Sequence, residues 1–207
     1  KEIVELMIGR PLASAFPERL EITEDTEVVL KVTDLHGEYF GPVTFNVRRG
    51  EIIGIAGVEG NGQGDLFWTL CGAIPPKGGQ VQVFDKHVNL TSPTGALNSG
   101  MARPFLRDNV NVILADEPTQ GVDVAARFDI YEALHTKATQ GAALVVKSSD
   151  PIELASLCNR GFVISRGQIV HDIPQEQLSE RTIIDAMVRG AKLGNVEDQF
   201  AFGGRED

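Results

Sequence analysis

Two adjacent carboxylates are the residues of this chain best suited to chemistry. Asp116 and Glu117 directly follow the apolar run 112–115, and Pro118 comes immediately after the two acids. An apolar run closed by a turn signal is typical of a strand buried on both faces of a parallel sheet. Open α/β sheets bind ligands at the carboxyl ends of their strands, so both acids are expected in a ligand site. Paired carboxylates there suit a phosphate with bound Mg²⁺, one acid near the metal and the other orienting a water.

A glycine-rich loop weakens the simpler alternative, which is a strand end with two solvated acids followed by an Asp that caps a helix. Residues 51–56 also have the pattern of a buried strand, and a helical pattern begins at residue 65. A strand, a glycine-rich loop and a helix form the context in which backbone N–H groups and a helix N-terminus bind phosphate. The residues expected to bind it are Gly57, Gly60, Asn61, Gly62, Gln63, Gly64 and Asp65.

The same loop departs from the phosphate-loop pattern at its end. Gly57 and Gly62 have the expected spacing, but the pattern then requires Lys and Ser or Thr, where this chain has Gln63 and Gly64. The loop therefore lacks both its cation and its metal-binding hydroxyl. Glu59 adds a negative charge that would repel phosphate unless it points outward.

Together the two segments resemble the ATP-binding subunit of ABC transporters, with Asp116 and Glu117 at the Walker B positions and Asp123 in the D-loop. More narrowly, the chain is similar to the C-terminal half of the duplicated ATPase of ribose/galactose-type sugar importers. Related importers for nucleosides and other small polar solutes share the pattern. The segments that carry this narrower resemblance are 7–10, 49–57, 91–93, 116–123 and 165–170.

This resemblance implies an α/β P-loop ATPase fold of ABC type: a mainly parallel core sheet with helices, plus a small antiparallel β layer. It implies ATP and Mg²⁺ as cofactors, with Asp116 facing the metal and Glu117 the attacking water. The implied partners are an N-terminal ATPase half of the same polypeptide or another ATPase domain, transmembrane permease subunits and, indirectly, a solute-binding protein. The implied location is the cytoplasmic face of the cell membrane.

Two further positions follow from the resemblance. Family members carry a histidine near the γ-phosphate after the strand that here spans 143–147, and the matching residue is Ser149. Serine can form hydrogen bonds but carries no positive charge. An aromatic residue faces the adenine in the family, and Tyr39 or Phe40 could serve, although an aromatic that simply covers the β layer is equally consistent.

The expected domain organisation has one large unit. Residues 1–24 resemble a connector from a preceding domain, 25–190 form the nucleotide-binding domain, and 191–207 have the composition of a flexible tail. Between residues 101 and 102 the family would have its glutamine loop, a helical subdomain and an LSGGQ-like signature, all absent from this sequence. Either a deletion joins the two residues or a segment is missing from the sequence, and the abrupt break favours the second.

Composition limits the remaining possibilities. The 19 basic and 29 acidic residues leave a net charge of −10, which argues against nucleic acid or an anionic membrane surface as a direct partner. No apolar run approaches the roughly 18 residues of a membrane span, so any role at a membrane is expected to act through another subunit. Cys71 and Cys158 are expected to be buried free thiols, and the four histidines lack metal-ligand spacing.

Several elements are predicted around the site. Asp123 should cap a helix over 124–139, and a last helix should begin near Ser179 and end at Gly190. Antiparallel strands should form over 27–32, 43–47 and 80–90, with a hairpin turn at Asp85 and Lys86.

Three functions remain open. These are an importer half with a degenerate site, a fully active ATPase, and a non-catalytic nucleotide-binding or docking module. The missing lysine favours the first and third, because phosphate charge would be poorly compensated, and residues 7–10 favour the first. The isolated chain is expected to be inactive as an ATPase.

Overall fold

The structure is a computed structural model that describes residues 16–102 and 110–200. The motif at 7–10 and most of the expected connector therefore lie outside the described residues, as does the last part of the expected tail.

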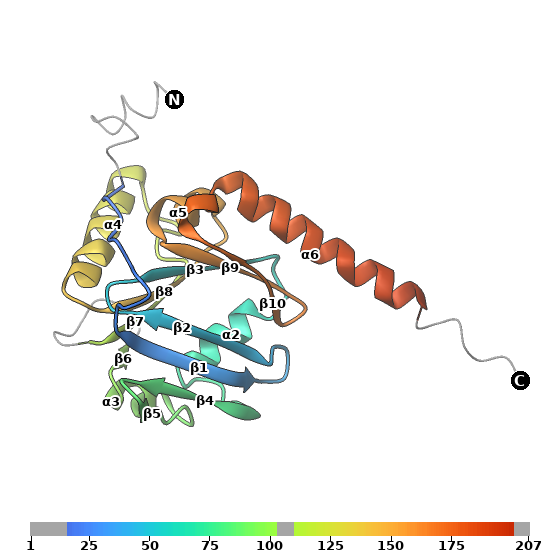
Figure 1. Ribbon diagram of the computed structural model, residues 1–207, viewed down its shortest axis with the longest axis horizontal. Coiled ribbons are helices and arrows are strands. Elements are labelled where there is room, and N and C mark those ends of the chain that lie inside the picture. Colours follow the sequence, from blue (N-terminus) through green and yellow to red (C-terminus); the bar gives the residue numbers. More distant parts are fainter. Residues whose placement is uncertain (1–15, 103–109, 201–207) are drawn as a thin grey trace, which may run out of the picture.

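A six-stranded sheet forms the centre of the molecule (Figure 1). All neighbouring strands are parallel except the first pair, which forms an antiparallel hairpin at one edge. The sheet confirms the mainly parallel core predicted from the sequence. In spatial order its strands are β10 (Gln168–Ile173), β9 (Arg160–Ser165), β3 (Ile52–Gly57), β8 (Ala143–Lys147), β7 (Val112–Asp116) and β6 (Met101–Ala102).

The central strands are apolar throughout because both faces of this sheet are covered. Ile53 and Ile55 of β3 pack into one hydrophobic core, whereas Ile52 and Ala56 pack into another on the opposite face. Successive side chains of a strand point to opposite faces, so a doubly covered strand needs apolar residues at every position.

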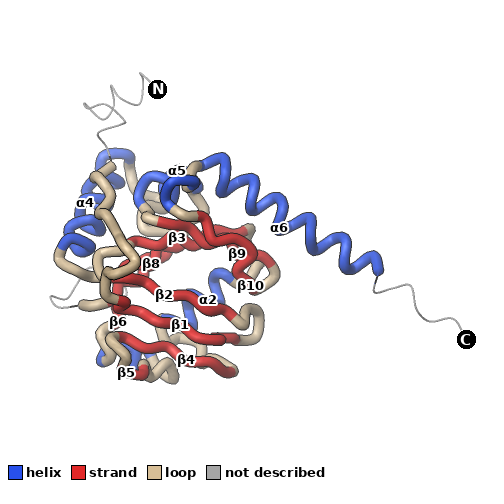
Figure 2. Tube along the Cα trace, in the orientation of Figure 1, coloured by secondary structure: helices blue, strands red, loops and turns tan. Residues whose placement is uncertain are grey.

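One face is covered by the small antiparallel layer that the sequence predicted (Figure 2). Helix α2 (Gln63–Leu70) buries Leu66, Phe67 and Leu70 in the same core, and α3 (Pro93–Asn98) follows the layer in the chain. The layer contains β2 (Val43–Arg48), β1 (Val28–His36), β4 (Gly78–Val83) and β5 (Lys86–His87), in that order.

The other face is covered by α4 (Val124–Thr139), α5 (Pro151–Leu157) and the first part of α6 (Glu180–Phe200), with a short 3₁₀ helix at Gln175–Gln177 before α6. The predicted cap is confirmed: the Asp123 carboxylate accepts hydrogen bonds from the backbone N–H groups of Ala125 and Ala126 at 2.9 and 3.0 Å.

Helix α6 continues to Phe200, past Gly190, where the sequence analysis placed its end. A single glycine costs only about 1 kcal/mol in a helix, so it does not stop one by itself. Gly190 has a packing role instead, since a Cβ there would lie 3.1 Å from the Ser165 side chain and 3.2 Å from that of Val170. The backbone of 191–200 is thus helical where a loose tail was expected.

Both cysteines are buried and neither forms a disulfide, as predicted. Burial raises the pKa of the Cys158 thiol well above its usual range, so this thiol stays protonated.

Tyr131 of α4 is expected to make the stability of the fold sensitive to alkaline pH. Its ring stacks on Phe16 at 4.9 Å, and burial, aided by the nearby Glu153 charge, raises the pKa of Tyr131 from 10.0 to about 12. The folded state holds this proton more tightly than the unfolded state, so the contribution is present below pH 10 and is lost as pH rises through about 12. We expect Tyr131→Phe to reduce the loss of unfolding free energy across this window, measured by urea denaturation. Identical pH profiles for the two proteins would contradict the assignment.

Candidate functional site

Three strand ends meet at one edge of the central sheet. Strand β8 lies between β3 and β7, so Lys147 pairs in register with Ile55 on one side and with Asp116 on the other. A cavity of about 540 Å³ opens beside these ends. Its lining includes Gly57, Glu59, Gly60, Gly62, Gln63, Gly64 and Asp65 from the loop after β3, and Asp116, Glu117, Lys147, Ser148 and Ser149 from the other two strand ends.

The loop has the backbone form of a phosphate loop. Helix α2 begins at Gln63 after Gly62, whose φ of 91° lies in the left-handed region, and no side chain caps the helix. Its first-turn N–H groups, which have no partner within the helix, therefore remain available as phosphate donors. Gly62 is also needed sterically, because the Tyr39 carbonyl oxygen leaves no room for a Cβ at this position.

The side chain of Gln63 lies across this loop. It is 7% exposed, and its amide nitrogen donates to the Val58 carbonyl at 2.8 Å. Its amide oxygen is buried without a hydrogen-bond partner in the described part of the chain. A neutral amide with an unpaired carbonyl oxygen offers no charge to a phosphate, so this position does not supply the electrostatic contact that a lysine would make.

Lys147 is a site residue that the sequence analysis missed. Its Nζ lies 2.6 Å from Asp116 Oδ1 and 3.5 Å from Glu117 Oε1, and the three side chains are 16–21% exposed. The available signal was a lysine that ends the apolar run of 143–147, since a charge at the end of a buried strand faces the same edge as Asp116.

Glu117 is held by Ser149. Its Oε2 accepts hydrogen bonds from the Ser149 N–H at 2.9 Å and from the Ser149 hydroxyl at 3.0 Å. The backbone of Glu117 has a φ of 44°, which is uncommon for a residue with a side chain. The expected water-orienting acid and the residue at the histidine position are thus joined directly to one another.

A buried carboxylate next to the cavity holds in place the two segments that carry Glu117 and Ser149. Glu153 of α5 is 1% exposed and accepts hydrogen bonds from the hydroxyls of Thr119, at 2.8 Å, and Ser148. Thr119 follows Glu117 closely and Ser148 precedes Ser149, so Glu153 positions both segments that carry the site.

Three predicted site residues lie outside the cavity lining. Asn61 accepts a hydrogen bond from the Arg166 N–H at 3.1 Å through its side chain, which ties the loop to the β9–β10 turn. Asp123 caps α4 as described. Tyr39 is 68% exposed and lines an adjacent hollow of about 580 Å³ with Arg166, whereas Phe40 is 5% exposed in the core. Of the two aromatic residues considered for adenine, Tyr39 has the accessible ring.

The residues present do not fit the expected Mg²⁺. Mg²⁺ requires near-octahedral oxygen coordination, generally from one or two carboxylates together with phosphates. Here the Lys147 ammonium contacts Asp116, and Gly64 provides no hydroxyl. Among residues 16–102 and 110–200, no group of three or more His, Cys, Asp or Glu side chains could hold a metal ion.

Solved structures define the class of this fold. The "ATP binding subunit of ABC transporter" matches with a TM-score of 0.66 at 15% identity, over 79% of this chain and 99% of that chain. An ATP-binding cassette of an ABC transporter in its ADP conformation matches with a TM-score of 0.68 at 14% identity, over 79% and 99% of the two chains. The fold is therefore that of an ABC ATPase, a P-loop NTPase with an added antiparallel β subdomain.

The chain is also similar in sequence to ribose import ATP-binding proteins. The ribose import ATP-binding protein RbsA 3 of Rhizobium meliloti is 28% identical over 96% of this chain and 55% of its own length. The ribose import ATP-binding protein RbsA of Halalkalibacterium halodurans is 26% identical, over 92% and 53% of the two chains. A scan of protein-family models found no match. Over most of its length the chain is similar in sequence to these ribose import ATP-binding proteins, and it spans about half the length of the curated relatives it matches.

Within the part of the chain that is described, no helix combines the length and apolar character needed to cross a membrane.

Proposed function

We propose that this chain is the ATP-binding component of an ABC-type sugar importer, corresponding to a C-terminal half whose own nucleotide site is degenerate. The observation that carries the proposal is the loop after β3: its backbone is that of a phosphate loop, while Gln63 and Gly64 stand where the cation and hydroxyl belong. The names of the related ribose import proteins support a sugar as the transported solute. The equivalent half of a nucleoside or other small-solute importer is the alternative within the same class.

The proposed partners are a second ATPase domain, which would be an N-terminal half of the same polypeptide or a separate chain, and transmembrane permease subunits, with a solute-binding protein acting indirectly. With these partners, the chain would lie at the cytoplasmic face of the membrane. The nucleotide site of the second ATPase domain would hydrolyse ATP, while this half would have a structural and regulatory role.

We also propose that a helical subdomain is missing at residues 101/102. The alignment with the R. meliloti relative runs over 276 residues, more than the 207 of this chain, so the relative has residues inside the matched region that this chain lacks. Residues 101 and 102 form the two-residue strand β6 at the edge of the sheet, so a subdomain inserted between them would interrupt an edge strand and leave the central strands in place. The full reading frame of the gene would test this assignment.

A non-catalytic nucleotide-binding or docking module is the second candidate. The observation that favours it is the charge of the cavity, whose described lining contains four acidic residues against one lysine. Such an excess of negative charge opposes a triphosphate.

Weak nucleotide binding is the expected result for the isolated chain. The absent lysine contact removes about 2–3 kcal/mol of charge-assisted hydrogen bonding. Millimolar ATP should therefore raise the thermal midpoint only slightly, since stabilisation depends on the ratio of ligand to dissociation constant. A low-micromolar dissociation constant by calorimetry would contradict the degenerate site, whereas an absence of any ATP effect would favour the docking module.

A further inference from the structure

We propose that Lys147 takes the place of the divalent metal in this cavity, so that the chain binds the phosphate groups of a nucleotide without Mg²⁺. The inference deepens the proposed function and rests on it for the identity of the ligand. The part that concerns the metal rests on the geometry of the site alone.

Lys147 lies between the strand of the glycine-rich loop and the strand of the paired acids. The residue ends β8, which pairs with both of these strands. Its ammonium lies 2.6 Å from Asp116 Oδ1 and 3.5 Å from Glu117 Oε1, so it bridges both carboxylates. Its side chain is 17% exposed and lines the same cavity as the loop glycines, where it is the single Lys or Arg among the described lining residues.

The Lys147 ammonium can contact a phosphate in addition to the two carboxylates. An ammonium has three N–H donors, so two contacts to carboxylates leave one for a phosphate oxygen. Like a metal ion, Lys147 thus offsets the acids and presents positive charge to the ligand. A Mg²⁺ bound by Asp116 would lie within a few ångströms of the ammonium, and two cations at that distance repel strongly in a partly buried site.

The other ligands that would favour a metal are also missing. Gly64 supplies no hydroxyl, and Ser149 donates two hydrogen bonds to Glu117. A metal would have to displace Lys147 from Asp116 and Glu117 from Ser149. The lysine requires neither change.

Nucleotide binding with and without Mg²⁺ tests this inference. ATP and ADP affinities are measured by calorimetry in millimolar MgCl₂ and in EDTA for the full 207-residue chain. We expect the two conditions to differ less than about threefold for the native chain. Lys147→Met should weaken binding in EDTA by about 10- to 100-fold, the loss expected for one charge-assisted contact, and Mg²⁺ should restore part of it.

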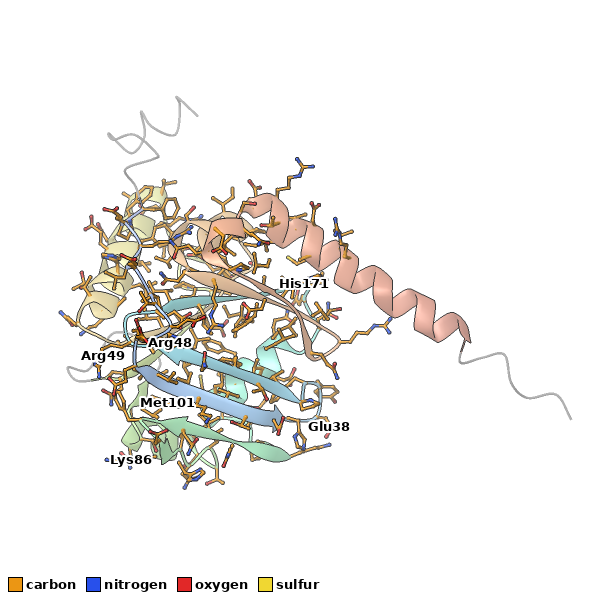
Figure 3. The ribbon with its side chains drawn as sticks, viewed as in Figure 1. Glu38, Arg48, Arg49, Lys86, Met101 and His171 are labelled. Carbon is orange, nitrogen blue, oxygen red and sulfur yellow. The ribbon has the colours of Figure 1, made fainter. Side chains whose placement is uncertain are left out.

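Two variants provide matched controls. Lys147→Arg retains the positive charge and should keep binding independent of Mg²⁺. Lys86→Met makes the same charge change on the exposed strand β5, at the outer edge of the antiparallel layer (Figure 3), and should behave like the native chain. Native binding that is more than about tenfold weaker in EDTA would overturn the inference, and this comparison needs no variant to fold.

Direct Mn²⁺ titration separates failure of this inference from failure of the proposed function. Electron paramagnetic resonance should show Mn²⁺ binding to Lys147→Met and none to the native chain or Lys86→Met. If the native chain binds no nucleotide in either condition, the proposed nucleotide function fails, and the Mn²⁺ result alone decides the metal question. Mn²⁺ binding to the native chain that Asp116→Asn abolishes would overturn the inference.

Discussion

The purified chain is expected to release no phosphate from ATP above background. Phosphoryl transfer requires charge compensation at the γ-phosphate and an oriented water. Gln63 and Ser149 supply no charge, and Glu117 is held by the Ser149 N–H and hydroxyl at 2.9 and 3.0 Å. Removing one well-placed stabiliser typically costs about 10²–10³ in rate, so the combined loss should leave no measurable turnover.

Steady-state phosphate release, compared with that of Glu117→Gln, is the decisive measurement for this prediction. A contaminating ATPase would persist unchanged in the variant preparation. Turnover by the native chain that disappears in Glu117→Gln would show that the site is catalytic and that the degenerate-site proposal is wrong.

Restoring the two missing phosphate-loop residues should produce the largest gain in affinity. We expect Gln63→Lys combined with Gly64→Ser to bind ATP about 30- to 150-fold more tightly than the native chain, equivalent to about 2–3 kcal/mol. The new lysine would replace a buried amide whose oxygen has no partner in the described structure, and its ammonium can contact the Val58 carbonyl or a phosphate. A Cβ at Gly64 would meet no atom within 4 Å, so serine fits there.

Single variants show which of the two substitutions produces the gain in ATP affinity. Gln63→Lys should account for most of it, because it supplies the charge. Gly64→Ala is the control for Gly64→Ser, since it makes the helix start equally less flexible without adding a hydroxyl. If the double variant binds ATP no better than the native chain in calorimetry, the acidic lining controls affinity and the loop substitutions do not.

The sequence by itself determined the main architecture because local signals agreed with the tertiary requirements. The patterns at 51–56 and 112–115 predicted buried strands, and the structure packs apolar residues of both strands into two cores on opposite faces of the sheet. The glycine spacing predicted a loop entering a helix, and Gly62 adopts the left-handed conformation at that point. Asp123 is both a motif residue and a cap, so its local role was also readable. The bounds of some elements were misplaced: β1 runs to His36, beyond the predicted end at residue 32, and α6 continues past Gly190 because one glycine is a weak stop signal.

Only the tertiary structure decided which residues meet at the site. Lys147 lies about 30 residues from Asp116 in the chain, and strand order alone brings its ammonium to 2.6 Å from that carboxylate. No local pattern indicates that β8 lies between β3 and β7. The sequence therefore did not distinguish Lys147 from an ordinary lysine at the end of a strand. Likewise, the contact between Ser149 and Glu117 depends on how two separate strands end beside each other. The residue types indicated a phosphate-binding site, whereas the order of the strands determined which charged side chains lie together in it.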